Sequence, residues 1–195
     1  MNIGEVMEII CPQLGIMRAP YNIMDNTHEI RELRAIMNEA GLDLVMRAPW
    51  RRLIKSVTEP AGTTTISLPA DARDERPVVL VFNGTTIVPR MGTAAYSMAS
   101  SIGGLAWNYE GNSVKLTSAP ASTTIYYVSK NWLDGTKSII DDNTNVLYVP
   151  AQAFMDSVRV RWLRKQGVPF DTELAEFSAN LEQAIRSEAF NGLSV

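Results

Sequence analysis

Apolar positions near the C-terminal end of the chain recur with the period of a helix. Phe154, Val158 and Trp162 lie four residues apart, so they would stack along one face of a helix packed against a core. Gly167 suits the left-handed residue that closes a helix, and the proline two positions later bars continuation. The pattern predicts a pair of helices over residues 150–187, broken once at this glycine.

A second helical pattern lies near the start of the chain, over residues 27–48, and Pro49 stops it. Its apolar residues follow one another at spacings of three and four. They are Ile30, Leu33, Met37, Ala40 and Leu44. A shorter helix with one apolar face is expected over residues 3–11, and Pro12 ends or interrupts it.

Between these helical parts, the pattern over residues 50–149 changes to that of strands separated by turns. The turn sequence Glu-Pro-Ala-Gly predicts a hairpin between strands 53–58 and 63–68. Asn83-Gly84 is the strongest two-residue hairpin signal in the chain. We therefore expect two antiparallel hairpins in the first half of this middle region.

The second half of the middle region is expected to form a meander of three strands. These strands are 105–109, 114–118 and 123–130. The segment 92–104 is rich in Ser, Ala, Gly and Met, and it fits either a short helix or a loop.

Helices at both ends and antiparallel strands between them predict an α+β fold. The N-terminal helices and the C-terminal helical hairpin would pack on a small antiparallel sheet or sandwich. At 195 residues, with no internal repeat or low-complexity linker, the chain is described most simply as one domain. Its expected parts are a helix at 27–48, a strand-rich middle at 50–149, a helix pair at 150–187 and a C-terminal extension at 188–195.

Composition narrows the classes of function. Apolar residues make up 46% and charged residues 20% of the chain, as in ordinary globular proteins. The net charge of −3 argues against a protein that binds nucleic acid through electrostatics. No apolar run is long enough to span a membrane, and Glu5 and Glu8 do not suit a signal peptide. A single cysteine, Cys11, fits folding in a reducing cytosol.

Few residues suggest catalysis. His28 is the only histidine, so a site that needs several His or Cys ligands is excluded, and a surface position is the simplest interpretation. Cys11 is expected to be a small buried apolar residue. No P-loop, dinucleotide-binding or zinc-protease motif occurs. We therefore predict no catalytic residues and no cofactor.

Two acidic stretches are candidates for metal sites. One is Asp141-Asp142-Asn143 with Asn145, which lacks the glycine and the final glutamate of a calcium-binding loop. The other comprises Asp71, Asp74 and Glu75, which alternate with Arg73 and Arg76. A polar turn and a solvated loop with local ion pairs are the favoured interpretations, so no metal ligands are predicted.

Two basic clusters stand out. The first comprises Arg47, Arg51 and Arg52, and the second, here called the 159–165 basic cluster, comprises Arg159, Arg161, Arg164 and Lys165. They would either contact phosphates or an acidic partner surface, or form a solvated helix face with ion pairs to nearby carboxylates. The second interpretation is favoured, with protein–protein contact as its main competitor.

Several motifs taken together resemble the head-to-tail adaptor (connector) proteins of tailed bacteriophages and related gene-transfer particles. These adaptors include the short-tail tubular proteins that sit beneath the portal. The motif residues are spread over about residues 30–170. They are Asn38-Glu39-Ala40-Gly41, Arg47, Trp50, Leu53, Leu68-Pro69-Ala70-Asp71, Tyr126-Tyr127-Val128-Ser129, Trp132, Gly135, Arg161-Trp162-Leu163-Arg164-Lys165 and Gly167. The chain departs from the pattern at Ala72-Arg73, where a bulky apolar residue is usual, and in segment 92–104.

The resemblance implies a structural subunit of the virion and not an enzyme. Such subunits form a ring, commonly twelvefold, that joins the portal vertex to the tail and continues the DNA channel. The implied partners are the portal protein, tail or nozzle proteins and further copies of this chain. DNA would only pass through, and no membrane insertion is implied. The implied location is the head–tail junction of the virion, assembled in the cytoplasm of the bacterial host.

The expected partner interface comprises the 159–165 basic cluster and the apolar residues of the C-terminal extension, Phe190, Leu193 and Val195. We expect this extension to engage the portal. A head-completion or tail-completion protein is the first alternative. A carbohydrate-binding module that uses exposed Trp107 and Tyr109, or a metal-dependent enzyme that uses Asp71, Asp141 and Asp142, is a less favoured one.

Overall fold

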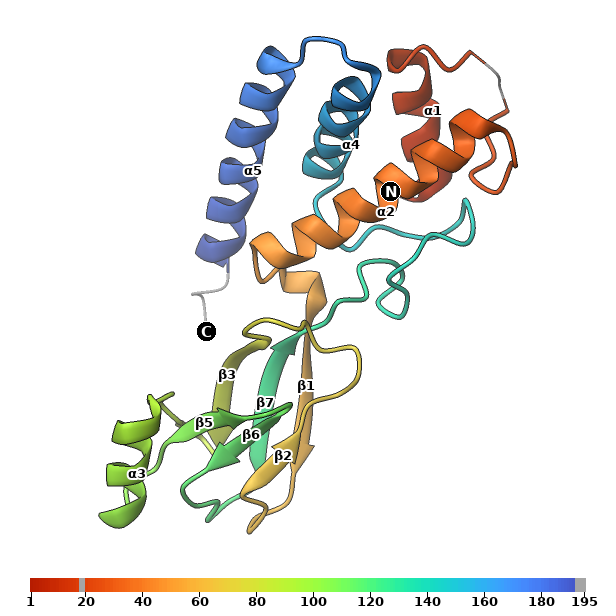
Figure 1. Ribbon diagram of the computed structural model, residues 1–195. Coiled ribbons are helices and arrows are strands. Elements are labelled where there is room, and N and C mark those ends of the chain that lie inside the picture. The colour runs from red at the N-terminus through yellow and green to blue at the C-terminus, as the bar shows by residue number, and fades with distance from the viewer. Residues whose placement is uncertain (18–19, 192–195) are drawn as a thin grey trace. The chain divides into compact units, whose positions relative to one another are not determined.

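The computed structural model describes residues 1–17 and 20–191, without the side chains of residues 189–191. By its internal contacts the chain divides into two compact units (Figure 1). The helical unit comprises Met1–Leu53 and Lys130–Val195, and the strand unit comprises Ile54–Ser129. Helices and antiparallel strands are both present, so the predicted α+β class is confirmed. The single-domain description stays a prediction.

In the helical unit, the first two helices follow the predicted pattern. Helix α1 spans Ile3–Gln13, so Pro12 does not end the helix as expected but lies within its last turn, and Leu14 caps it. Its start is a capping box: Asn2 accepts a hydrogen bond from the Glu5 N–H, and Glu5 accepts one from the Asn2 N–H. Helix α2 spans His28–Arg47, and all five apolar residues predicted to face the core are buried.

The C-terminal helices also form where the pattern predicts them. Helix α4 spans Ala151–Gln166, and Gly167 ends it in the left-handed conformation with φ 68°. Phe154, Val158 and Trp162 are all buried, which confirms the predicted apolar face. Helix α5 spans Asp171–Asn191 and packs on α4. The helix therefore continues into the segment that was expected to be an extension beyond residue 187.

The core of the helical unit is centred on tryptophans. Trp132 is fully buried, donates its indole N–H to the Ser138 carbonyl oxygen at 2.9 Å, and packs against Phe154 with ring centroids 5.4 Å apart. The ring of Trp132 lies on Gly41 of α2, where any side chain would overlap it. Trp50 is also buried and donates to the Leu44 carbonyl oxygen at 2.6 Å, just before the short 3-10 helix Arg51–Leu53.

The strand unit contains two antiparallel sheets with strand orders β1-β7-β3-β4 and β2-β6-β5. The strands are β1 Ile54–Glu59, β2 Thr65–Ser67, β3 Val78–Asn83, β4 Thr86–Ile87, β5 Trp107–Glu110, β6 Ser113–Leu116 and β7 Thr123–Val128. Apolar side chains from both sheets, among them Ile66, Val81, Val114 and Ile125, form one buried cluster. The sheets therefore pack face to face as a small sandwich.

Two predicted strand pairings are wrong. Strands β1 and β2 do not form a hairpin, because β1 pairs with β7 and β2 pairs with β6. Strand β7 does not continue a meander from β6 and instead lies between β1 and β3 in the other sheet. A turn forms at residues 61–62 after β1, but in both cases the chain crosses from one sheet to the other. Because successive strands enter opposite sheets, the apolar faces of the two sheets are buried against each other.

The Asn83-Gly84 hairpin is confirmed, with the turn one residue later than expected. Asn83 is the last residue of β3 and pairs with Thr86, so the two-residue turn is Gly84 and Thr85, with φ 59° at the glycine. The Asn83 side chain is buried and bonds both the backbone N–H and the carbonyl oxygen of Ala121. The structure also settles the open segment 92–104, which forms helix α3, Thr93–Ser101.

Candidate functional site

Arg161 of the 159–165 basic cluster bridges two helices of the helical unit. Its guanidinium lies 3.0 Å from the Asp43 carboxylate and 3.5 Å from that of Glu39, both on α2. It also donates to the hydroxyl oxygen of Ser157, one turn earlier on α4. The α2–α4 packing thus carries an ion-pair network whose central cation is Arg161.

The electrostatics of Asp43 reflect this network. Burial raises the pKa of Asp43, but hydrogen bonds from Arg47 and Arg161 outweigh it and hold the pKa below its ordinary value. Arg47 donates to Asp43 at 2.8 Å and lies over the ring of Phe177 on α5, with 5.7 Å from guanidinium carbon to ring centroid. Asp43 therefore links α2, α4 and indirectly α5.

The other members of the 159–165 basic cluster divide into paired and unpaired residues. Arg159 lies 3.4 Å from Glu173 of α5, and Lys165 lies 2.9 Å from Glu32 of α2. The hydrogen bond from Lys165 lowers the pKa of Glu32. Within the part of the chain that the structure describes, Arg164 is exposed and has no ion pair. It is the member of the cluster that is available to a partner.

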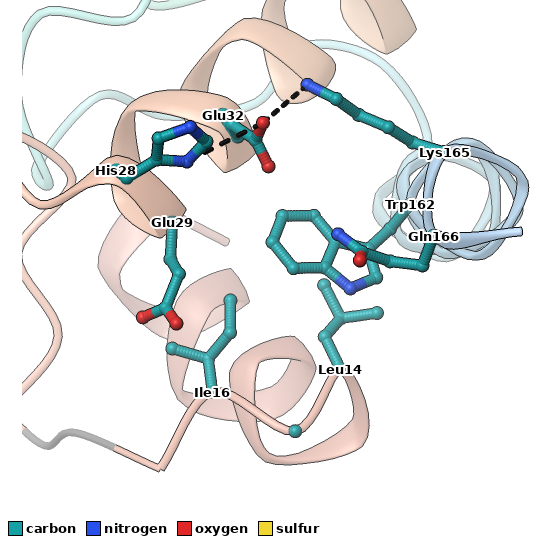
Figure 2. Close-up of a pocket in the computed structure, with 9 residues that line it drawn as sticks. Leu14, Ile16, His28, Glu29, Glu32, Trp162, Lys165 and Gln166 are labelled. Carbon is teal, nitrogen blue, oxygen red and sulfur yellow. Dashed lines mark ion pairs between the residues drawn. The ribbon is translucent and has the colours of Figure 1, made fainter.

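A groove of about 500 Å³ opens beside this network (Figure 2). Trp162, Leu14 and Ile16 form its apolar part, and His28, Glu29, Glu32 and Lys165 place charged or polar groups around them (Figure 2). His28 is an exposed residue at the start of α2, 3.6 Å from the Glu32 carboxylate. Because its polar groups differ in sign and are partly paired with one another, the groove shows no single ligand chemistry.

The first basic cluster is less engaged. Arg47 belongs to the network around Asp43, whereas the side chains of Arg51 and Arg52 are exposed. The backbone N–H of Arg51 donates to the Glu188 carboxylate at 2.9 Å, which holds the far end of α5 against the 3-10 helix. The charges of Arg51 and Arg52 are thus also open to a partner surface.

In the strand unit, the Asp71 carboxylate contacts three donors, one on β1, one on β7 and one just after β7. It pairs with Lys55 of β1 at 2.6 Å and accepts hydrogen bonds from the Tyr127 hydroxyl at 3.1 Å and the Ser129 hydroxyl at 2.8 Å. Burial raises the pKa of Asp71, but the hydrogen bonds from these donors outweigh burial and hold the pKa below its ordinary value. Burial and the hydrogen bond to the Asp71 carboxylate raise the pKa of Tyr127 to about 12. No local pattern predicts this cluster, since its members lie far apart in the chain.

The other residues that were candidates for metal binding, at positions 141–145, make an ion pair and hydrogen bonds to the backbone. Asp141 pairs with Lys137 at 2.8 Å, and the Asn145 side chain accepts hydrogen bonds from the N–H groups of Asp141 and Asp142. The side chain of Asn143 bonds the backbone of residues 21 and 23. Among the described residues, no group of three or more His, Cys, Asp or Glu side chains is arranged to hold a metal ion.

The loop of Asp74 and Glu75 is organised around an arginine. The Arg73 guanidinium donates to the carbonyl oxygens of Glu75 and Arg76, and burial lowers its pKa. The expected solvated loop is present, and Arg73 makes both hydrogen bonds to backbone oxygens and an attractive electrostatic interaction with Glu75.

The aromatic pair considered for carbohydrate binding does not present open ring faces. Trp107 is 4% exposed and belongs to the buried cluster of the sandwich. Tyr109 packs edge-on against it and its hydroxyl accepts the Val78 N–H at 3.1 Å. Arg90 lies over both rings, 4.8 Å from the centroid of Tyr109. These residues support the sandwich instead.

Cys11 is buried in α1, and burial raises the pKa of its thiol to about 12, so it is not a reactive nucleophile near neutral pH. Of the expected C-terminal contact residues, the side chain of Phe190 and the whole of Leu193 and Val195 lie outside the described residues. No described helix is both long enough and apolar enough to cross a bilayer.

Comparison with models of known protein families finds no match, and comparison with curated proteins finds none.

Proposed function

We propose that this chain is a structural subunit of a tailed-phage or related gene-transfer particle, forming a ring that joins the portal vertex to the tail and continues the DNA channel. In this proposal its partners are the portal protein, the tail or nozzle proteins and copies of itself, and DNA only passes through. Its location is the head–tail junction of a virion assembled in the host cytoplasm.

The observation that carries the proposal is that the motif residues of the resemblance pair with one another. Glu39 contacts Arg161, and Gly41 accommodates the ring of Trp132. In the strand unit, Asp71 accepts hydrogen bonds from Tyr127 and Ser129. Short matches that were unrelated to one another would not be expected to meet in this way. Their pairing supports one inherited pattern of contacts and hence the adaptor interpretation.

The contacts of the polar residues also support a scaffold role. Two carboxylates that were candidates for metal chemistry, Asp71 and Asp141, pair with lysines and hold loops and strands. Most of the 159–165 basic cluster ties α4 to α2 and α5. Arg164 remains exposed at the end of α4, and we assign it to the contact with the portal.

The experiment is co-sedimentation of the purified chain with the portal protein of the same particle. We expect binding by the full chain and an affinity reduced about tenfold by Arg164→Glu, since the change reverses a charge at an interface. Arg31→Glu is the matched control, because Arg31 is an exposed arginine on α2 that has no ion pair among the described residues and lies outside the proposed interface. No binding by the full chain would refute the adaptor function.

A deletion of residues 189–195 tests the C-terminal part of the proposed interface in the same assay. Weaker portal binding is expected, because the deletion removes the apolar Phe190, Leu193 and Val195. Unchanged binding would remove this segment from the interface while leaving the adaptor function in place. Mapping the chain within purified particles separates the adaptor role from that of a head-completion or tail-completion protein.

A further inference from the structure

An uncharged arm protrudes from the strand unit. The arm comprises residues 91–106, and no charged residue occurs anywhere between Arg90 and Glu110. It contains α3, of which Ala99 is the one buried residue. Met98 is 69% exposed and Ile102 is 82% exposed. Apolar side chains exposed this far on an element without charges indicate a contact surface.

A second uncharged surface lies on the outer face of the sheet β1-β7-β3-β4. Apart from the pair Ile54–Val128 at one end of the sheet, the strand register places seven side chains on this face, opposite to those that enter the sandwich core. They are Ser56, Thr58, Leu80, Phe82, Ile87, Thr124 and Tyr126. Ile87 is 58% exposed and Tyr126 is 38% exposed. The ring of Phe82 packs edge-on against that of Tyr126, with 5.9 Å between the ring centroids. None of the seven is acidic or basic.

Within one chain these two surfaces do not cover each other. Helix α3 contacts β5, which belongs to the sheet β2-β6-β5. This sheet covers the inner face of the sheet β1-β7-β3-β4 through the shared core, so the arm and the outer face lie on different sheets (Figure 1). Met98 and Ile102 on the arm, and Ile87 and Tyr126 on the sheet, all remain exposed. Within the described residues of the strand unit, neither surface buries these side chains of the other.

We propose that the uncharged arm of one copy docks on the outer face of the sheet β1-β7-β3-β4 of a second copy. The two surfaces match because each would bury apolar side chains without desolvating a charge. The contact joins different patches on the two copies, so it is heterologous and generates a ring when the rotation closes. The proposal deepens the proposed function, on which it rests for the closed ring, by naming the contact between neighbours.

The test uses cysteine crosslinking of the full-length chain. Met98→Cys and Tyr126→Cys are made as single variants and mixed, so that a disulfide between the two positions has to join two chains. The native Cys11 is buried and stays in place. Ser67→Cys, exposed on the other sheet, replaces Tyr126→Cys in the control mixture. The doubly substituted chain, Met98→Cys with Tyr126→Cys, is oxidised alone.

We expect the 98–126 mixture to crosslink at least about tenfold faster than the control, and the double variant to form a ladder of covalent oligomers. Ile102→Glu, which buries a charge in the contact, should slow this crosslinking about tenfold, whereas Ser67→Glu should not. A rate equal to the control, in solution and on the portal, would overturn the proposal. So would an intramolecular disulfide in the double variant.

The two proposals fail in different assays. Loss of the 98–126 crosslink with retained portal binding would overturn the arm–sheet contact and leave the adaptor function standing. A ladder of crosslinked oligomers without portal binding would support the arm–sheet contact and overturn the adaptor function. If the chain does not bind the portal, the crosslinking rate in solution decides the contact by itself.

Discussion

The replacement Gly41→Ala tests whether the helical unit depends on close contact between α2 and Trp132. A Cβ at this position would lie 2.5 Å from Cδ2 of the Trp132 ring, and other ring atoms would be nearer still. Carbon atoms pack at about 3.5–4.0 Å, so the ring or the helix has to move by roughly 1 Å or more. Trp132 has little room to move, because it is fully buried against Phe154 and bonded to Ser138.

The magnitude follows from two opposing effects. Alanine stabilises a helix interior by about 1 kcal/mol relative to glycine. Displacing a buried tryptophan costs about 3–5 kcal/mol, as for other large losses of core packing. The free energy of unfolding should therefore fall by about 2–4 kcal/mol, a large part of a typical total of about 5–15 kcal/mol.

Urea unfolding followed by far-ultraviolet circular dichroism measures this change. Gly92→Ala serves as the control, because no atom lies within 4 Å of the place that its Cβ would take, and the φ of Gly92 is ordinary. Gly92→Ala should alter the free energy of unfolding by less than about 1 kcal/mol. In a Trp132→Leu background, the cost of Gly41→Ala should shrink, because the smaller side chain leaves room. A Gly41→Ala variant as stable as the parent would refute the reasoning.

Three further predictions concern charged and nucleophilic groups. Because the pKa of Asp71 is lowered in the folded state, its stabilising effect is complete above the unfolded pKa of about 3.9 and is lost as the pH falls through the folded pKa. Below about pH 4, the melting temperature of the parent should therefore drop more steeply than that of Asp71→Asn, and parallel curves would contradict this. In urea titrations, Arg161→Gln should lower the free energy of unfolding by about 1–3 kcal/mol, because it removes a charged partner of Asp43. Arg164→Gln should change it by less than about 0.5 kcal/mol, and equal effects would contradict the assignment of Arg161 as paired and Arg164 as unpaired. Cys11 should resist a thiol reagent in the native state and react only on unfolding, and labelling at the rate of a free thiol would show that it is accessible.

Helices were predictable because their determinants are local. Apolar spacing places the buried faces of α2 and α4, and a single glycine marks the end of α4 in the left-handed conformation. One further local signal was available, since Asn2 and Glu5 have the spacing of a capping box at the start of α1. The predicted end of α5 at residue 187 is too early, because the apolar pattern weakens there although the helix continues to Asn191.

Strand partners were not predictable from the same local signals. Alternating residues indicate that β1 and β7 are strands, but alternation does not say which strand lies beside which. The turn after β1 is as compatible with a crossing between sheets as with a hairpin. Only the packing of two sheets around one core selects the β1–β7 pair.

The candidate interface shows the same division. The sequence by itself determined that Arg159, Arg161, Arg164 and Lys165 lie together on one helix, through their spacing. The tertiary structure decided which of them form ion pairs within the chain, because the carboxylates that pair with Arg161 and Lys165 come from α2, more than a hundred residues earlier. Contacts between distant segments depend on how helices pack, and that is a property of the folded chain.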